Sequence, residues 1–267
     1  MTDGVNVNCL SVVIPVFNEA EHLASRISQF KMVLDKLVGN PNWELVIVNN
    51  GSTDATVSVL EQIKSETSNF YDYFIPSPNY GKAIQYGIGE TRYPWIYVVD
   101  LDQWDDAFIQ WSWKYRYDYA LITSSKRADP SLNRQSRVRF FLSWGLNAML
   151  QLLFSFPGSD THGQKLLNRN SLEKILKQTL ADRGQYDVEL VVRTLRSGKK
   201  MVELPVPYIE MRPSRNSLIK KVVWNCWALS KLAWRLRGMN YGSVELRRIS
   251  RSDVENTRGF RYEGKVD

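Results

Sequence analysis

The stretch Trp95-Ile-Tyr-Val-Val-Asp-Leu-Asp-Gln103 decides the fold, because an apolar run typical of a buried strand ends abruptly in two carboxylates. Residues i and i+2 of an extended segment project to the same side, so Asp100 and Asp102 can aim at one point. Two converging carboxylates suit Mg²⁺ or Mn²⁺, and through the ion a diphosphate. A solvated turn at a strand end explains an isolated acidic pair equally well, so the neighbouring sequence has to decide.

Apolar strand patterns alternate with helical patterns on both sides of this stretch. Strands are expected over residues 10–16, 44–48, 71–75, 95–99 and 119–123, and helices over 21–37, 55–66, 81–89 and 104–117. This alternation predicts an α/β fold, with a mostly parallel, Rossmann-like central sheet and helices on both faces. Ligands of such sheets bind at the carboxyl ends of the strands, where the polar turns of this chain fall.

The second half of the sequence is richer in helical patterns. Helices are expected over residues 134–154, 171–180, 188–197 and 217–237, with short edge strands at 166–167 and 201–207. The tail from Tyr241 is charged and is expected to be loosely held. The sequence therefore predicts a catalytic domain over 8–212 and, over 213–267, an amphipathic helix and a charged tail that are candidates for membrane association.

Composition narrows the classes of partner. The 267 residues carry a net charge of +7, with a pI near 9.3, so an anionic partner is expected: phosphorylated substrate, acidic membrane surface or nucleic acid. Cys9 and Cys226 lack metal-site spacing and fit a reducing compartment. No signal-peptide pattern and no convincing membrane-spanning segment is found, which predicts a cytoplasmic protein that is soluble or peripherally bound to a membrane.

Several further motifs occur in a fixed order around the acidic pair. They are Val13-Ile-Pro-Val-Phe-Asn-Glu19, Val48-Asn-Asn-Gly-Ser-Thr-Asp54, Asn79-Tyr-Gly-Lys82, Val99-Asp-Leu-Asp102, Asp160-Thr-His-Gly-Gln-Lys165 and Arg212-Pro-Ser-Arg-Asn-Ser217. Together they resemble the inverting glycosyltransferases with the GT-A fold, and most closely the dolichol-phosphate mannose synthase and dolichol-phosphate glucosyltransferase branch. The resemblance covers roughly residues 10 to 220, and six motifs in order make coincidence an inadequate explanation.

The resemblance implies roles for particular residues. A nucleotide-sugar site is implied at Pro15, Phe17, Glu19, Asn49, Asn50, Ser52, Lys82, Asp100, Leu101 and Asp102. A Mg²⁺ or Mn²⁺ ion is implied at Asp100, Asp102 and Gln103, with Asp105 as an alternative third ligand. Acceptor-phosphate contacts are implied at Lys126, Arg127, Arg137, Arg139, Lys165, Arg212, Arg215 and Ser217, and catalytic roles at Asp102, Arg137, Asp160 and His162.

The activity that the resemblance implies is transfer of a hexose from a GDP-mannose or UDP-glucose type of donor to a polyprenyl or dolichyl phosphate. A phosphate acceptor is itself a competent nucleophile, which fits a chain with two histidines and no evident Ser/His/Asp set. The partners expected are thus a nucleotide sugar, a polyprenyl phosphate and the cytosolic face of a membrane, and no nucleic acid.

Three departures from the family pattern keep alternatives open. Asn49-Asn50 stands where the family often has two aspartates, Gln103-Trp104 follows the acidic pair, and Gln164 stands where an aromatic residue is usual. One alternative is a related transferase that acts on a soluble or glycan hydroxyl, with Asp160, His162 or Glu189 as its base. The other is a catalytically silent homologue that binds nucleotide sugar. Capping of a helix accounts for Asp187 in either case.

The expectation that the protein contacts lipid rests mainly on two helical patterns. The 217–237 pattern combines Trp224, Trp227 and Trp234 with several lysines and arginines, as in helices that lie on anionic membranes, although packing on the catalytic domain explains it equally well. The apolar part of 140–156 follows a basic start, which favours a lipid-facing groove over a place in the core.

Overall fold

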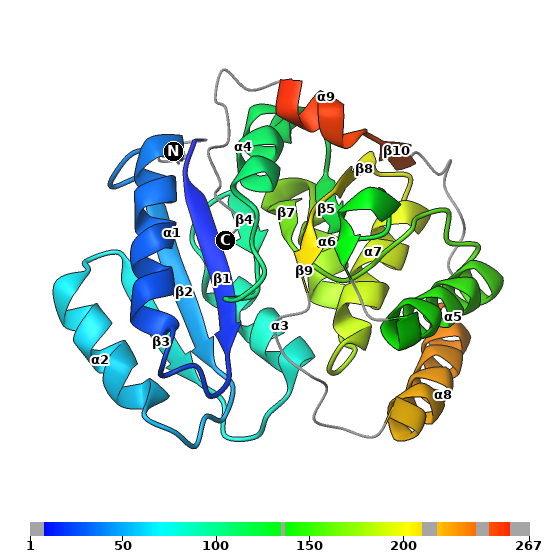
Figure 1. Cartoon of the computed structure of the whole chain (residues 1–267), viewed down its shortest axis with the longest axis horizontal. Helices are drawn as coiled ribbons and strands as arrows, with labels where there is room; N and C mark the ends of the chain where they lie inside the picture. The colour runs from blue at the N-terminus through cyan, green and yellow to red at the C-terminus, as the bar shows by residue number, and fades with distance from the viewer. Residues whose placement is uncertain (1–7, 135–136, 210–217, 239–245, 257–267) are drawn as a thin grey trace.

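A computed structural model describes residues 8–134, 137–209, 218–238 and 246–256. Its centre is an eight-stranded sheet in the order β10-β8-β5-β7-β4-β1-β2-β3, drawn in Figure 1. Every neighbouring pair of strands is parallel except the two pairs that involve β7. The predicted α/β class and the mostly parallel sheet are therefore confirmed.

The bounds of the strands follow the predicted apolar runs closely in the first half of the chain. The sheet contains β1 (Leu10–Val16), β2 (Trp43–Asn49), β3 (Phe70–Phe74), β4 (Trp95–Val98), β5 (Leu121–Ser125), β7 (Lys165–Asn168), β8 (Met201–Pro205) and β10 (Leu246–Arg248), and β6 (Asn133–Arg134) pairs separately with β9 (Tyr208–Ile209). All seven residues of β2 are buried, because helices cover both faces of the sheet.

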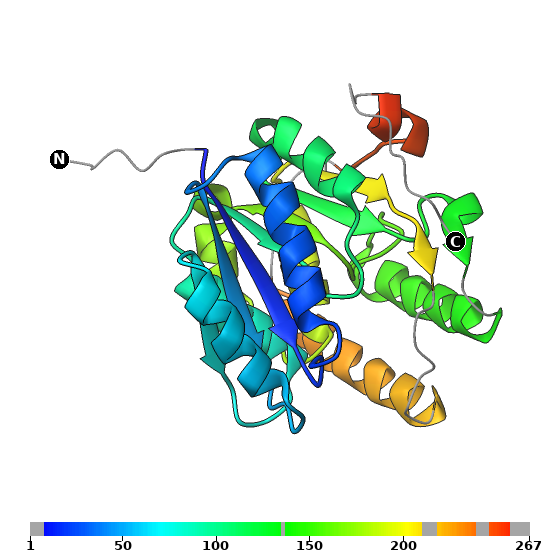
Figure 2. The same ribbon diagram turned by 60° about the vertical axis from the view of Figure 1, so that its left-hand side comes forward.

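Helices occupy both faces, as the views in Figures 1 and 2 show. One hydrophobic cluster joins the sheet to α1 (Leu23–Leu37), α2 (Thr56–Glu66), α4 (Asp106–Lys114) and α9 (Arg251–Asn256). The other joins it to α3 (Tyr80–Glu90), α5 (Arg137–Phe154), α6 (Arg169–Gln178), α7 (Gln185–Arg196) and α8 (Leu218–Leu236). Successive residues of β1 alternate between the clusters: Val12 and Ile14 belong to the first and Val13 to the second.

The placement of two strands differs from the prediction. The short run at Leu166–Leu167 was expected at an edge, but β7 lies in the middle of the sheet, antiparallel between β4 and β5. β8, also expected at an edge, has β5 on one side and β10 on the other. Its one proline, Pro205, is tolerated because it ends the strand, beyond the three positions that pair with β10, and Pro207 lies after the strand.

The helices α5 and α8 pack side by side (Figures 1 and 2). Leu229, Leu232 and Leu236 of α8 are buried against the domain, whereas Trp227 and Trp234 are exposed. α8 is therefore amphipathic and packs by its leucine face, as one of the two sequence interpretations predicted. Among the described residues, none of the helices has the length and apolarity needed to cross a bilayer.

The tail is more firmly held than the sequence indicated, at least over residues 246–256. β10 extends the sheet beside β8, and Val254 of α9 is 1% exposed in the first hydrophobic cluster. Arg251 of α9 also forms an ion pair with Asp105. The expectation of a loose tail is wrong for this part, because its few apolar residues and its arginines find partners that the linear sequence does not reveal. The division of the chain at residues 212 and 213 stays a prediction.

Candidate active site

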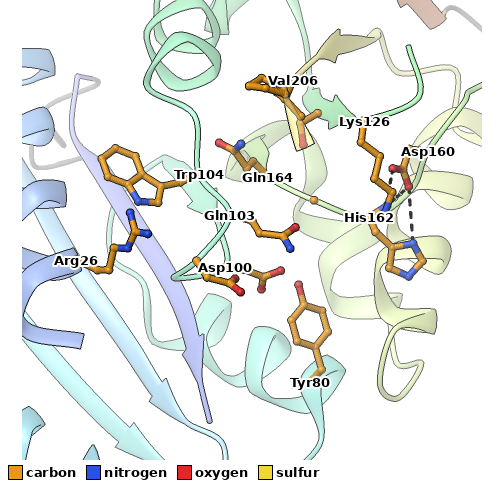
Figure 3. A pocket seen from close by; sticks show the side chains of 14 residues that line it. Arg26, Tyr80, Asp100, Gln103, Trp104, Lys126, Asp160, His162, Gln164 and Val206 are labelled. Atoms are coloured by element: carbon orange, nitrogen blue, oxygen red, sulfur yellow. Dashed lines mark hydrogen bonds and ion pairs between the residues drawn. The ribbon is translucent and has the colours of Figure 1, made fainter. Parts of the chain in front are cut away.

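A cavity of about 310 Å³ lies beside the carboxyl end of β4, between the turn after β4 and the loop before β7. Figure 3 shows the acidic turn, with Arg26 and Trp104 on one side and Lys126, Asp160 and His162 on the other. The lining residues are Arg26, Tyr80, Asp100, Asp102, Gln103, Trp104, Ser124, Lys126, Asp160, His162, Gly163, Gln164, Val206 and Pro207. The structure thus brings together the acidic pair, the predicted acceptor residue Lys126 and the predicted catalytic residues Asp160 and His162.

The acidic turn is held by backbone pairing. Val99 donates to the carbonyl of Val13, which extends the pairing of β4 with β1, and the amide of Gln103 donates 3.3 Å to the carbonyl of Asp100. Burial, followed by the charges of Asp187 and Asp102, raises the pKa of Asp100 to about 6. A nearby cation would relieve this penalty on the ionised form.

Tyr80, the first residue of α3, supports the acidic turn from below in Figure 3. Its hydroxyl donates a hydrogen bond to the carboxylate of Asp100, and burial raises the pKa of the Tyr80 hydroxyl well above its usual value. The phenol is therefore a permanent donor at neutral pH. α3 begins here because Asn79 caps it, accepting from the amide of Lys82 at 3.1 Å.

Of the two residues predicted as a third metal ligand, Gln103 fits this role better than Asp105 does. Asp105 is the N-cap of α4: one carboxylate oxygen accepts from Ala107 at 2.7 Å, and the other pairs with Arg251 at 2.7 Å. Both oxygens of Asp105 are therefore occupied. Gln103 lines the cavity next to the acidic pair.

The residues present fit a divalent cation that shares its coordination with a substrate. Within the described ranges there is no group of three or more His, Cys, Asp or Glu side chains placed to hold a metal by themselves. Mg²⁺ and Mn²⁺ prefer oxygen ligands, and Mg²⁺ sites often combine one or two carboxylates with substrate phosphates. The carboxylates of Asp100 and Asp102 and the side-chain amide oxygen of Gln103 supply part of such a set of oxygen ligands in one cavity, and substrate phosphate would supply the rest.

The predicted nucleotide residues build the loops at the same end of the sheet. The side chain of Asn49 accepts from the amide of Ser52 at 2.9 Å, and the Ser52 hydroxyl accepts from the amide of Asn18 at 3.0 Å. Asn50 accepts from the amide of Asn79 at 2.6 Å, so the turn after β2 is tied to the start of α3. The side-chain oxygens of Asn49 and Asn50 therefore accept hydrogen bonds that hold these turns. Aspartate oxygens could accept the same bonds, so asparagines in place of the family's usual aspartates keep the turn intact.

Most of the predicted nucleotide residues lie outside the cavity lining. Asn49 and Asn50 are buried, Phe17 is exposed, and only the acidic pair reaches the cavity. The predicted residues that the lining does not include are Pro15, Phe17, Glu19, Asn49, Asn50, Ser52, Lys82 and Leu101. Their role in binding a nucleotide stays a prediction.

The opposite wall is organised by a buried carboxylate that the sequence did not single out. Glu203 of β8 accepts from the amides of Ser159 and Asp160 at 2.9 and 3.0 Å. Asp160 in turn accepts from the amide of His162 and lies 3.9 Å from the ammonium of Lys126. Burial lowers the pKa of His162, so its imidazole is neutral at pH 7.

Lys165 lies beneath the cavity in a buried ion pair. Its ammonium is 2.8 Å from Asp187 and 2.7 Å from the carbonyl oxygen of Gly163, and both side chains of the pair are 1% exposed. The capping explanation for Asp187 is wrong, because its carboxylate faces the β7 lysine. A direct contact between Lys165 and acceptor phosphate stays untested.

Glu189, one of the bases expected for a hydroxyl acceptor, has a structural role in the fold. Its buried carboxylate accepts from the amides of Leu180 and Ala181 and pairs with Arg193 and Arg235. It therefore joins α7, α8 and the loop before α7.

Among the described side chains, none of the remaining predicted acceptor residues is part of the cavity lining. Arg212, Arg215 and Ser217 lie outside the described residues. Arg137 and Arg139 start α5, whose backbone is described there, whereas their side chains are not. Arg127 is half-buried, outside the cavity lining.

Sequence reasoning missed several lining residues because no local pattern marks them. Arg26 comes from the first turn of α1, where a polar residue is typical of solvated surface. Tyr80 belongs to the Asn79–Lys82 motif, for which the resemblance implies a role only at Lys82. Trp104 packs on Phe30 of α1, with ring centroids 4.2 Å apart, and forms a cavity wall.

The comparisons with known proteins agree on a family of glycosyltransferases. The family model described as glycosyl transferase family 2 matches residues 11–176. The dolichyl-phosphate beta-glucosyltransferase ALG5A of Trichomonas vaginalis is 29% identical over 218 residues, covering 77% of this chain and 67% of its own. The dolichyl-phosphate beta-glucosyltransferase of Drosophila melanogaster is 28% identical over 228 residues, covering 77% and 68%.

Solved structures agree on the fold. The mannosyltransferase PcManGT from Pyrobaculum calidifontis, solved in complex with GDP-Man and Mn²⁺, superposes with a TM-score of 0.59 at 16% identity, covering 85% of this chain and 64% of its own. Mannosyl-3-phosphoglycerate synthase from Rubrobacter xylanophilus gives 0.55 at 14% identity, covering 86% and 74%. The expected GT-A fold is confirmed.

Proposed function

Because the chain belongs to glycosyl transferase family 2, we propose that it transfers a hexose from a nucleotide diphosphate sugar to a polyprenyl phosphate. The observation that carries the proposal is a single cavity with carboxylates on one wall and a lysine on the opposite wall. Asp100 and Asp102 offer oxygen ligands for a metal-bound diphosphate, and Lys126 offers a cation across from them. Relatives named for dolichyl-phosphate glucosyl transfer point to the same class of acceptor.

On the donor side, the acidic turn would hold Mg²⁺ or Mn²⁺ through Asp100, Asp102 and Gln103. A divalent ion bound there supplies charge neutralisation to a leaving nucleoside diphosphate. Tyr80 keeps the Asp100 carboxylate in place by its hydrogen bond. The loops that follow β1 and β2 would hold the nucleoside, with Glu19, Asn50 and Lys82 as the candidate contacts.

On the acceptor side, we propose a substrate that supplies its own anionic nucleophile. The Asp160 carboxylate is engaged by Lys126 and the amide of His162, and Glu189 is committed to two arginines. His162 is then the base that the alternative hydroxyl acceptor would need. A phosphate monoester is already anionic at neutral pH and can attack directly. In-line attack opposite the departing diphosphate would invert the anomeric carbon. Lys126, and the arginines at the start of α5, would bind the phosphate oxygens.

A lipid acceptor also requires access to a membrane, and α5 with α8 offers a suitable surface. Trp227 and Trp234 are 61% and 69% exposed, and Trp144 of the adjoining α5 is 58% exposed. Lys231 and Arg237 lie over the rings of Trp227 and Trp234, which places cations beside the aromatics. Exposed indoles with flanking cations suit the interface of an anionic bilayer. We propose peripheral binding at the cytosolic face.

A donor panel tests this function. The full chain is incubated with UDP-glucose, GDP-mannose and related donors and Mn²⁺, with and without a short polyprenyl phosphate in detergent, and release of nucleoside diphosphate is followed. Release that requires both one donor and the lipid phosphate supports the proposal. Release that is indifferent to the lipid would exclude it, and donor binding without release from any donor would indicate a silent homologue.

A further inference from the structure

The segment of β10 and α9, residues 246–256, contacts both walls of the cavity from outside. After α8 the chain returns to the far edge of the sheet, adds β10 beside β8 and places α9 against α4 (Figure 1). We refer to Leu246–Asn256 as the C-terminal clamp. Neither of its elements lines the cavity, so any influence on the reaction has to act through other residues.

The first contact of the C-terminal clamp is on the acidic turn. Arg251 donates from a terminal nitrogen to Asp105 at 2.7 Å, and the two side chains are only 13% and 8% exposed. Asp105 lies two residues after Gln103, the last residue of the acidic turn. Its own amide donates 3.1 Å to the side-chain oxygen of Gln164, a cavity-lining residue of the opposite wall. Asp105 therefore links the clamp, the acidic turn and the loop before β7.

The second contact is on the opposite wall. Arg248 lies 3.3 Å from the carboxylate of Glu203, and the amide of Ile249 donates to the carbonyl of Glu203 at 3.3 Å. Glu203 holds the amides of Ser159 and Asp160, as described above. Both walls of the cavity are thus tied to one segment, through the largely buried Arg251–Asp105 pair on one side and through the exposed Arg248 and the backbone of Ile249 on the other.

We propose that Arg251 is a positioning residue, which through Asp105 fixes the acidic turn relative to the wall that carries Asp160 and Gln164. The inference rests on the proposed function, since the distance between these walls would set how donor and acceptor phosphates meet. Charge-assisted hydrogen bonds of low exposure hold a single geometry better than apolar contacts do. Misplacement by about 1 Å can cost about 100-fold in rate, so such fixing matters.

The kinetic test compares three variants of the full chain. Arg251→Met removes the link, Arg251→Lys keeps a cation that can reach Asp105, and Glu255→Gln removes the exposed partner of Arg251 on the same helix while leaving Asp105 paired. We expect kcat to fall about 10-fold in Arg251→Met with both KM values within about twofold, partial recovery in Arg251→Lys, and wild-type values in Glu255→Gln. Equal kcat in folded Arg251→Met and wild type would overturn the proposal.

Hydrogen exchange supplies a readout that does not depend on the reaction. Amides of residues 100–108 should exchange faster in Arg251→Met than in wild type, while those of α2, which packs beside β3 at the opposite edge of the sheet from β10, should not change. Unchanged exchange over 100–108 overturns the positioning role. A wild-type protein without lipid-dependent turnover would instead refute the proposed function, and the exchange data would still decide whether the clamp holds the turn. If Arg251→Met does not fold, Arg251→Lys carries both measurements.

Discussion

At the scale of single residues, the acidic pair that ends β4 is the feature from which the site could be predicted. Asp100 and Asp102 line one cavity, as predicted, although they do so from a turn after β4 and not from an extended segment, and Gln103 joins them. The sequence could not reveal Tyr80 or Arg26, because each reaches the cavity from a helix whose orientation depends on packing. Asp105 looked like a possible ligand only because its partner Arg251 is 146 residues away.

Replacing Asp102 by Asn tests the metal role most locally. The change removes one charge from the proposed ion site with little change in volume, so turnover should fall at least about 100-fold at saturating Mn²⁺. Steady-state release of nucleoside diphosphate measures the effect. Asp106→Asn, in the first turn of α4, is the control that should stay within about twofold. Equal activity in both variants would mean that the metal site is misassigned.

Replacing Tyr80 by Phe tests the support of the acidic turn. Loss of the hydrogen bond to Asp100 should weaken Mn²⁺ binding about 10-fold, the usual range for groups that orient a metal ligand. Titration with Mn²⁺, read by electron paramagnetic resonance of the free ion, checks this. Tyr86→Phe, exposed on the same helix, should bind Mn²⁺ like wild type. Wild-type affinity in Tyr80→Phe would leave Tyr80 with a packing role alone.

At the scale of elements, the parallel βαβ half was predictable and the strand order was not. The strands up to β5 have apolar runs bounded by turn residues, so their bounds could be read locally. β7 is short, and its position between β4 and β5 depends on pairing with strands about 45 to 70 residues earlier in the chain. Its central place also explains why Lys165 is buried rather than exposed at an edge.

The Lys165–Asp187 pair predicts an asymmetric response in stability. Lys165→Met leaves an uncompensated buried carboxylate and should cost about 3–5 kcal/mol of unfolding free energy. Lys165→Met combined with Asp187→Leu should recover much of that loss, because an apolar pair of similar volume carries no desolvation penalty. Urea unfolding of both proteins makes the comparison. A double variant less stable than the single one would contradict this account of the pair.

At the scale of the whole molecule, the candidate membrane surface on α5 and α8 is made of residues that do not line the cavity. The amphipathic pattern of α8 was readable from the sequence, but which face packs was not. The structure buries its leucines and exposes its tryptophans.

This arrangement predicts that vesicle binding and soluble turnover can be separated. Trp227→Ser with Trp234→Ser should weaken binding to vesicles that contain anionic lipid about 10-fold, since two indoles leave the interface. Turnover of a short, detergent-soluble polyprenyl phosphate should change less than about twofold, because neither residue lines the cavity. Vesicle sedimentation and the release assay measure the two effects. Unchanged sedimentation would place the membrane contact elsewhere.

The central claim is that an acceptor phosphate attacks the donor sugar without a protein base. The most direct measurement compares two acceptors that differ only in the phosphate, a short polyprenyl phosphate and the matching polyprenol, with the same donor and Mn²⁺. The lipid product is extracted and its mass determined. The account predicts hexosyl phosphoryl lipid from the phosphate and no product from the alcohol. Comparable transfer to the alcohol would contradict it, since a hydroxyl acceptor requires a base that this account does not assign.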